Sequence, residues 1–134
     1  MRTHLEFDAP RFEEPDGVGN TYNPDIQGGK LGEFLSNEFK ELGYSGAIIE
    51  EDWGWMVELA ADKFPLWLGC ASYGSRINWL VFIEPSKPLV RKWFKKIDAR
   101  PVVAKVADQL ETIVTTKGGA TNLKWWSDHD SGRK

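Results

Sequence analysis

A run of four short strand-like segments between residues 45 and 84 constrains the fold most. The segments are residues 45–50, 55–60, 64–73 and 76–84, and the connections between them are too short to hold a helix. In the second and fourth segments apolar and polar side chains alternate, which is the period of a strand with one buried face. Consecutive strands with such short connections pair antiparallel. The sequence therefore predicts an antiparallel meander.

Three further segments have the apolar spacing of amphipathic helices, at residues 31–42, 86–97 and 98–117. Gly43 follows the first segment, where a residue of left-handed conformation commonly ends a helix. Pro88 suits the first turn of the second segment, because its missing N–H would have no partner there. We expect all three segments to be helical.

Short strands are expected at residues 5–8 and 123–126, before and after these segments. Helices kept apart from an antiparallel sheet define the α+β class. The sequence thus predicts a four- to five-stranded meander sheet with the helices packed on one face, in two layers. Its 134 residues suit a single domain, with a long loop at 10–29 and a flexible tail at 128–134.

Composition and charge argue against several classes of function. The net charge of −3 argues against general nucleic-acid binding. The only cysteine, Cys70, cannot form an internal disulfide, and its apolar neighbours predict an inert thiol in the core. The first residues do not read as a signal peptide, and the apolar segments are too short to span a bilayer. We therefore expect a soluble cytoplasmic protein without membrane contact.

No catalytic or cofactor site stands out in the sequence. His4 and His129 lie near its opposite ends, where chains fray, which argues against histidine-based catalysis. Gly17 and Gly19 begin like a dinucleotide-binding motif, but Tyr22 occupies the place of its third glycine. We therefore predict no catalytic residue, no metal ligand and no cofactor.

Charge is distributed unevenly along the chain. Residues 1–62 have a net charge of −10 and residues 63–134 a net charge of +7. Either the two halves neutralise each other in the fold, or an acidic face attracts a basic partner. Residues 87–100 place six basic side chains around Trp93 and Phe94. As a helix, this stretch would present a solvated basic face or a surface for an anionic partner.

The most informative acidic group is Glu50-Glu51-Asp52. If the strand continues, Glu50 and Asp52 share one side, where paired carboxylates can divide acid and base roles or hold Mg²⁺ or Ca²⁺. Three acids at a strand end are also typical of a solvated turn, or of a site that recognises a partner. All three interpretations stay open at this point.

Seven tryptophans are many for a chain of this length. The large rings of Trp67, Trp79 and Trp93 are expected to fill the core. Trp53 adjoins the acidic group, and an exposed Trp beside charges is typical of a binding hot spot. Tyr22 is expected to pin the long loop or to contact a ligand.

Residues 50–55 read E-E-D-W-G-W and follow a predicted helix that ends near Gly43. Over about residues 28–60, the chain resembles small uncharacterised bacterial proteins that share an E-D-W-G-W signature. The resemblance implies a bacterial source but brings no established activity, so no functional residue is taken from it. Small acidic bacterial proteins of this sort include many immunity proteins that neutralise secreted toxins.

Three functions are consistent with these features. The first is a protein-binding module, in the manner of an immunity or antitoxin protein, whose acids attract a basic partner and whose aromatics anchor it. Its predicted binding residues are Glu13, Glu14, Asp16, Tyr22, Glu50, Glu51, Asp52 and Trp53. The second is a small-molecule-binding protein or a carboxylate-dependent enzyme with a site near Glu50–Trp55. The third is a homodimer joined through the sheet face opposite the helices, where Trp55 or Trp79 is expected; without such an interface the chain is a monomer.

Overall fold

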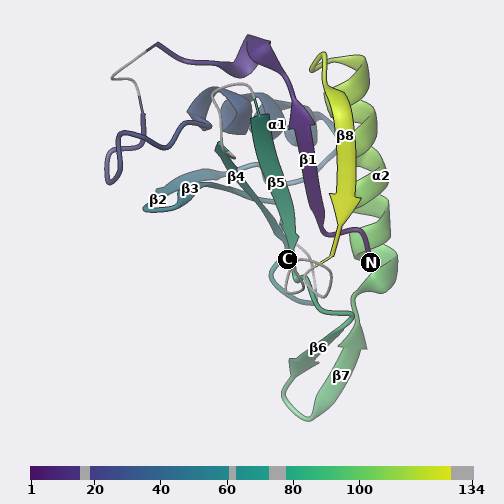
Figure 1. The fold of residues 1–134 in the computed structure, drawn as a ribbon. Coiled ribbons are helices and arrows are strands. Elements are labelled where there is room, and N and C mark those ends of the chain that lie inside the picture. Colours follow the sequence, from purple (N-terminus) through teal and green to yellow (C-terminus); the bar gives the residue numbers. More distant parts are fainter. Residues whose placement is uncertain (16–18, 61–62, 73–77, 128–134) are drawn as a thin grey trace.

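The computed structural model describes residues 1–15, 19–60, 63–72 and 78–127, which form an α+β fold (Figure 1). Its elements, in chain order, are β1 (His4–Asp8), the short 3₁₀ helix η1 (Pro10–Phe12), α1 (Gly29–Glu41), β2 (Ile48–Glu51), β3 (Gly54–Glu58), β4 (Trp67–Ser72), β5 (Asn78–Glu84), β6 (Leu89–Lys92), β7 (Lys95–Asp98), α2 (Arg100–Thr116) and β8 (Thr121–Trp126).

The main sheet has six strands in the order β2-β3-β4-β5-β1-β8, and every neighbouring pair is antiparallel. The predicted meander is therefore confirmed as β2 to β5. The sheet exceeds the predicted four to five strands because β1 and β8 both join it, next to each other. Helix α1 packs against β2, β3 and β4, and α2 packs against β5, so both helices cover the same face (Figure 1).

The core lies between this sheet face and the two helices. Leu5 and Phe7 of β1 and Trp79 of β5 are fully buried there, as is the predicted apolar stripe of α2. The indole N–H of Trp79 donates a 2.8 Å hydrogen bond to the backbone carbonyl of Ala9. Cys70 is also fully buried, and burial raises the pKa of its thiol to about 12. The predicted core positions of Trp79 and Cys70 are therefore confirmed.

The first helix ends as the sequence predicts. The last residue of α1 is Glu41, and Gly43 follows with a φ of +96°, in the region that favours glycine. The third predicted helix is confirmed as α2. The carboxylate of Asp98, just before it, accepts a 3.0 Å hydrogen bond from the backbone N–H of Arg100.

The predicted helix at residues 86–97 is wrong, because this stretch forms the antiparallel hairpin β6–β7 with a two-residue turn at Trp93 and Phe94. The apolar spacing fits both structures. Val90 and Ile97 would share one face of a helix, but they are also direct cross-strand partners when the turn lies midway between them. Both pack against the core at the base of the hairpin. Trp93, expected in the core, is instead 85% exposed.

The described part of the long loop at 10–29 is held in place by Asn20, which is only 1% exposed. Its amide nitrogen donates hydrogen bonds to the carbonyls of Glu51 (2.6 Å) and Gly54 (3.1 Å). Its amide oxygen accepts hydrogen bonds from the backbone N–H groups of Tyr22 and Asn23. Asn20 therefore pins the loop to the β2–β3 turn, while the Tyr22 side chain expected in that role is 67% exposed.

The homodimer alternative requires Trp55 or Trp79 on the outer sheet face, opposite the helices, but both lie on the side of the helices. Trp79 points into the core, and Trp55 lies against Gly28, Gly29 and Gly32 at the start of α1. The predicted alternation of β3 and β5 is confirmed, and its apolar side faces the helices. The outer face carries the alternate residues of these strands.

Candidate binding surface

A band of cross-strand neighbours crosses the outer face of the sheet. The strand register makes Met56, Gly69, Phe82, His4 and Trp126 direct cross-strand neighbours, one each from β3, β4, β5, β1 and β8. Direct neighbours in a sheet share a face, with Cβ atoms about 5 Å apart. The topology thus aligns residues from distant parts of the sequence in one continuous band.

Five aromatic rings of this region contact one another. The His4 ring stacks on Trp126, with centroids 4.1 Å apart, and on Phe82 at 5.7 Å. Phe82 also contacts Trp53 at 5.3 Å and Trp67 at 5.7 Å. These separations are typical of favourable aromatic pairs. We call His4, Phe82, Trp126, Trp53 and Trp67 the aromatic row.

The rings of the aromatic row are packed into the surface of the sheet. Its four larger rings are half-buried, whereas His4, between Phe82 and Trp126, is only 8% exposed. The Oγ1 atom of Thr3 lies 2.8 Å from Nδ1 of His4, which fixes the imidazole. The expectation that His4 lies in a fraying end is wrong, because β1 has a paired strand on each side.

Carboxylates flank the aromatic row. Glu58 of β3 and Glu84 of β5 are the cross-strand neighbours of Trp67 and share its face. Glu6 accepts a hydrogen bond of 2.5 Å from the indole N–H of Trp126. Half-exposed aromatic rings bordered by acids suit contact with a surface that combines apolar and basic groups.

The structure separates the three acids at positions 50–52. Strand β2 ends at Glu51, and Asp52 lies with Trp53 in the turn to β3, so Glu50 and Asp52 do not share a strand face. The Glu50 carboxylate accepts hydrogen bonds from the backbone N–H and the hydroxyl of Thr21. Asp52 is exposed. Glu50 therefore helps to hold the loop, and Trp53 is the predicted site residue that joins the aromatic row.

The other predicted site residues lie along the loop. Glu14 is half-buried, and its carboxylate accepts a 3.3 Å hydrogen bond from the N–H of Lys30, in the first turn of α1. A carboxylate at this end of a helix is stabilising. Glu13 and Tyr22 are exposed, and Asp16 lies outside the described residues. Glu14 therefore has a structural role here.

Three hollows in the described surface have volumes of about 510, 420 and 330 Å³. Each is lined by residues other than the acids at 50–52. The hollow of 420 Å³ adjoins the aromatic row, since Met56, Glu58 and Trp67 line it together with Lys92 of the hairpin. Within the described ranges, no group of three or more His, Cys, Asp or Glu side chains is placed to hold a metal ion.

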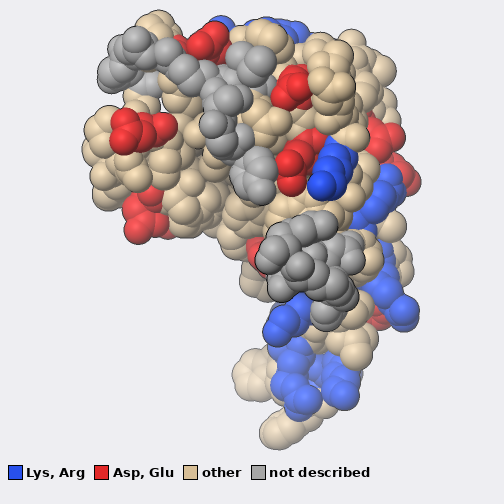
Figure 2. Space-filling model, in the orientation of Figure 1, with Lys and Arg blue, Asp and Glu red and all other residues tan. Residues whose placement is uncertain are grey.

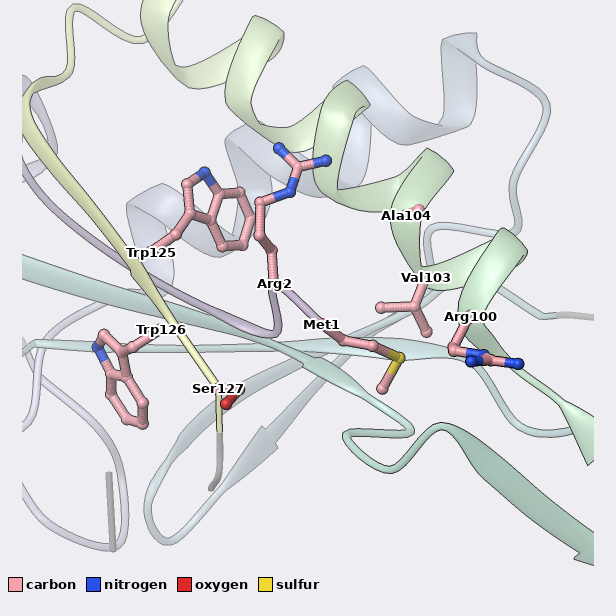
Figure 3. Close-up of a pocket in the computed structure, with 8 residues that line it drawn as sticks. All are labelled: Met1, Arg2, Arg100, Val103, Ala104, Trp125, Trp126 and Ser127. Atoms are coloured by element: carbon pink, nitrogen blue, oxygen red, sulfur yellow. The ribbon is translucent and has the colours of Figure 1, made fainter. Parts of the chain in front are cut away.

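The hollow of 510 Å³ lies between α2 and the end of β8 (Figure 3). Two arginines line it. Arg2 lies 5.3 Å from the centroid of the Trp125 ring and donates a 2.5 Å hydrogen bond to Asp108. Arg100 donates two hydrogen bonds of 2.9 Å to the carboxylate of Asp98. Both guanidinium groups thus already have a carboxylate partner, which makes this hollow a weaker candidate than the aromatic row.

Sequence reasoning missed four members of the aromatic row. Trp67 was expected in the core, and His4, Phe82 and Trp126 were not considered as one site. The alternation of side chains along each strand was the available signal. It places Trp67 of β4 and Phe82 of β5 on the outer face of the sheet. Their assembly depends on β1 pairing between β5 and β8, and no local pattern indicates that pairing.

Comparison of the chain with protein-family models, with curated proteins and with solved structures gave no match. Of the helices among the described residues, none is long and apolar enough to cross a membrane.

Proposed function

We propose that this chain is a protein-binding module, and that its interface is the aromatic row with its flanking acids. The observation that carries the proposal is the contact of Trp53 with Phe82 and Trp67, which extends the β2–β3 turn into a half-exposed aromatic surface. Rigid aromatic rings lose little conformational entropy when a partner covers them, and they are frequent hot spots of interfaces.

The chemistry of the surface indicates the chemistry of the partner. Glu58 and Glu84 border Trp67, and Glu51 and Asp52 adjoin Trp53. A partner that presents apolar side chains within a basic rim is complementary to this arrangement. The acids would chiefly raise the association rate, and the aromatic contacts would chiefly slow dissociation.

One particular form of this function is that of a bacterial immunity or antitoxin protein, which binds and neutralises a toxin in the cytoplasm. That form rests on the resemblance of residues 50–55 to the E-D-W-G-W signature and on the acidic first half of the chain. The alternative of a carboxylate-dependent enzyme near Glu50 is less well supported, because this carboxylate is engaged by Thr21.

Affinity capture from the source organism's lysate, quantified by mass spectrometry, tests the proposal. Four baits are compared: the unchanged chain, Glu51→Lys with Asp52→Lys, Trp53→Ala, and Glu33→Lys with Glu41→Lys. The last pair makes the same charge change on exposed positions of α1 and serves as the matched control. Glu50 is left unchanged, because its substitution would release the loop.

The proposal predicts a companion protein that binds the unchanged chain and the α1 control in equal amounts. The Glu51→Lys, Asp52→Lys bait should lose it, as should a Trp53→Ala bait. A companion retained equally by all of these baits would place the interface elsewhere. With no companion on any bait, the protein-binding proposal is abandoned for the small-molecule alternative.

A further inference from the structure

The β6–β7 hairpin has two aromatic side chains at its tip, and both are exposed to solvent. Trp93 is 85% exposed and Phe94 is 99% exposed. Together they form the two-residue turn that connects the strands. Exposed large apolar groups side by side on a projecting turn are uncommon on a protein surface and mark an interaction site.

The arrangement of the basic side chains destabilises the hairpin. Arg91 lies directly opposite Lys96, and Lys92 directly opposite Lys95. Like charges at directly opposed positions of an antiparallel pair repel each other. Within the described part of the chain, none of these four side chains forms an ion pair. The repulsion is relieved when an anionic surface lies beside them.

The backbone of the tip is also unfavourable. Trp93 has a φ of +58°, a conformation that bulky side chains rarely adopt. Glycine or asparagine is the usual residue for such a turn position. The exposed Trp93 side chain does not stabilise the fold in return for this backbone strain. Such strain is typical of functional segments.

The hairpin projects from the rest of the chain (Figure 1). Its strands have four residues each, which corresponds to a reach of about 13 Å. Lys and Arg side chains gather over it, whereas Asp and Glu side chains lie mainly over the sheet (Figure 2). The reach exceeds the distance of about 8 Å over which charges act at physiological ionic strength. The side chains near its tip therefore present a positive field, while Lys92 also lines the 420 Å³ hollow together with Glu58 of the sheet.

We propose that the β6–β7 hairpin docks on anionic lipid bilayers, with Trp93 and Phe94 inserted at the level of the headgroups. Tryptophan is enriched at that level of a membrane, where its ring is part apolar and part polar. Arg91, Lys92, Lys95 and Lys96 then lie at the phosphate groups of the lipids, which neutralise their mutual repulsion. The earlier expectation of no membrane contact concerned spanning segments, whereas this hairpin lies on the surface.

A lipid surface fits these observations better than a nucleic acid does. Proteins that bind single strands stack bases on aromatic rings along a basic groove, but here the rings lie at the apex of a turn. A nucleic acid lying alongside the hairpin would also meet the acidic sheet. A planar bilayer met end-on contacts the apex and the four cations and leaves the sheet at a distance.

Flotation with large unilamellar vesicles tests the proposal. One preparation is phosphatidylcholine alone, and the other is equal parts of phosphatidylcholine and phosphatidylglycerol. The unchanged chain should float with the anionic vesicles only, and added salt should weaken the association. Removal of each basic side chain of the hairpin should lower the partition coefficient about fivefold. The variant Trp93→Ala, Phe94→Ala should lower it by at least about tenfold.

Two matched controls separate the hairpin from general effects. Gln substitutions at Lys30, Lys40, Lys63 and Lys105 remove four exposed positive charges elsewhere and should leave most of the binding intact. Tyr22→Ala removes another exposed aromatic ring and should leave binding unchanged. Circular dichroism verifies that every variant is folded.

The proposal fails if the unchanged chain does not associate with the anionic vesicles. It also fails if the tip variant and the Tyr22→Ala control bind equally. A parallel titration with fluorescent single- and double-stranded oligonucleotides completes the test. Hairpin-dependent binding of an oligonucleotide without vesicle binding would overturn the assignment to lipid. Because these variants leave the aromatic row intact, the result is independent of the protein-binding proposal.

Discussion

The ring of Phe82 lies over Gly69, its direct cross-strand neighbour, and fills the space that a side chain there would need. A Cβ atom added to Gly69 would lie 2.1 Å from Cζ of Phe82. The absence of a side chain in the middle of β4 thus allows the central ring of the aromatic row to lie flat against the sheet.

Substitution of Gly69 by alanine should therefore push Phe82 aside. We expect the free energy of unfolding to fall by about 2 kcal/mol, as for other overpacked sites. Chemical denaturation of Gly69→Ala in the unchanged chain and in a Phe82→Ala background measures the coupling. The cost of Gly69→Ala should be much smaller in that background. An equal cost in both would show that the ring is not what excludes the side chain.

Asn20 should be the most sensitive position of the long loop. The substitution Asn20→Ala removes the hydrogen bonds from the Asn20 amide to the carbonyls of Glu51 and Gly54, and we expect the free energy of unfolding to fall by about 2–3 kcal/mol. Limited proteolysis should cut the loop faster in this variant. Asp25→Ala, at an exposed position of the same loop, is the control and should change stability by less than about 0.5 kcal/mol.

Stability should decrease in alkaline solution because of Cys70. The thiol has a pKa of about 12 in the folded chain and ionises near its ordinary value of 9.0 when unfolded. Between these values the folded state binds more protons than the unfolded state, so the free energy of unfolding falls as pH rises. The contribution approaches about 1.4 kcal/mol per pH unit. Denaturation of the unchanged chain and of Cys70→Ala across this range isolates it, since only the unchanged chain should show this part of the slope.

Two tryptophans should respond to substitution in opposite ways. Trp79 is fully buried and its indole N–H is hydrogen-bonded to Ala9, so Trp79→Ala should reduce the free energy of unfolding by about 3–5 kcal/mol. Trp93→Gly removes a side chain with few contacts and relieves a positive φ. It should leave stability unchanged or raise it by about 1 kcal/mol. A large loss of stability in Trp93→Gly would contradict the description of the turn as strained. Urea denaturation measures both variants.

Much of the fold follows from patterns that act over short distances. The stripe of α2, the end of α1 before Gly43 and the order β2 to β5 were predictable, because each depends on the spacing of neighbouring residues. The stretch at 86–97 was not, because seven-residue spacing of Val90 and Ile97 serves a helix and a hairpin equally well.

The candidate surface was less predictable than the fold. Trp53 was identified from its acidic neighbours, but its contacts with Phe82 and Trp67 depend on which sheet face the helices cover. The role of Asn20 could not be predicted either, because the sequence of a loop does not show whether an asparagine in it is buried or exposed. Both depend on pairings between distant segments, which local spacing does not encode.

The place of β1 between β5 and β8 has a consequence for biosynthesis. Thr3 and Trp126 are hydrogen-bonded although they are 123 positions apart in the sequence. A ribosome releases β1 early, yet one edge of that strand stays without its partner until β8 has been made. A nascent chain that ends before Thr121 therefore exposes an unpaired strand edge, which is the kind of surface that chaperones shield and that aggregates recruit.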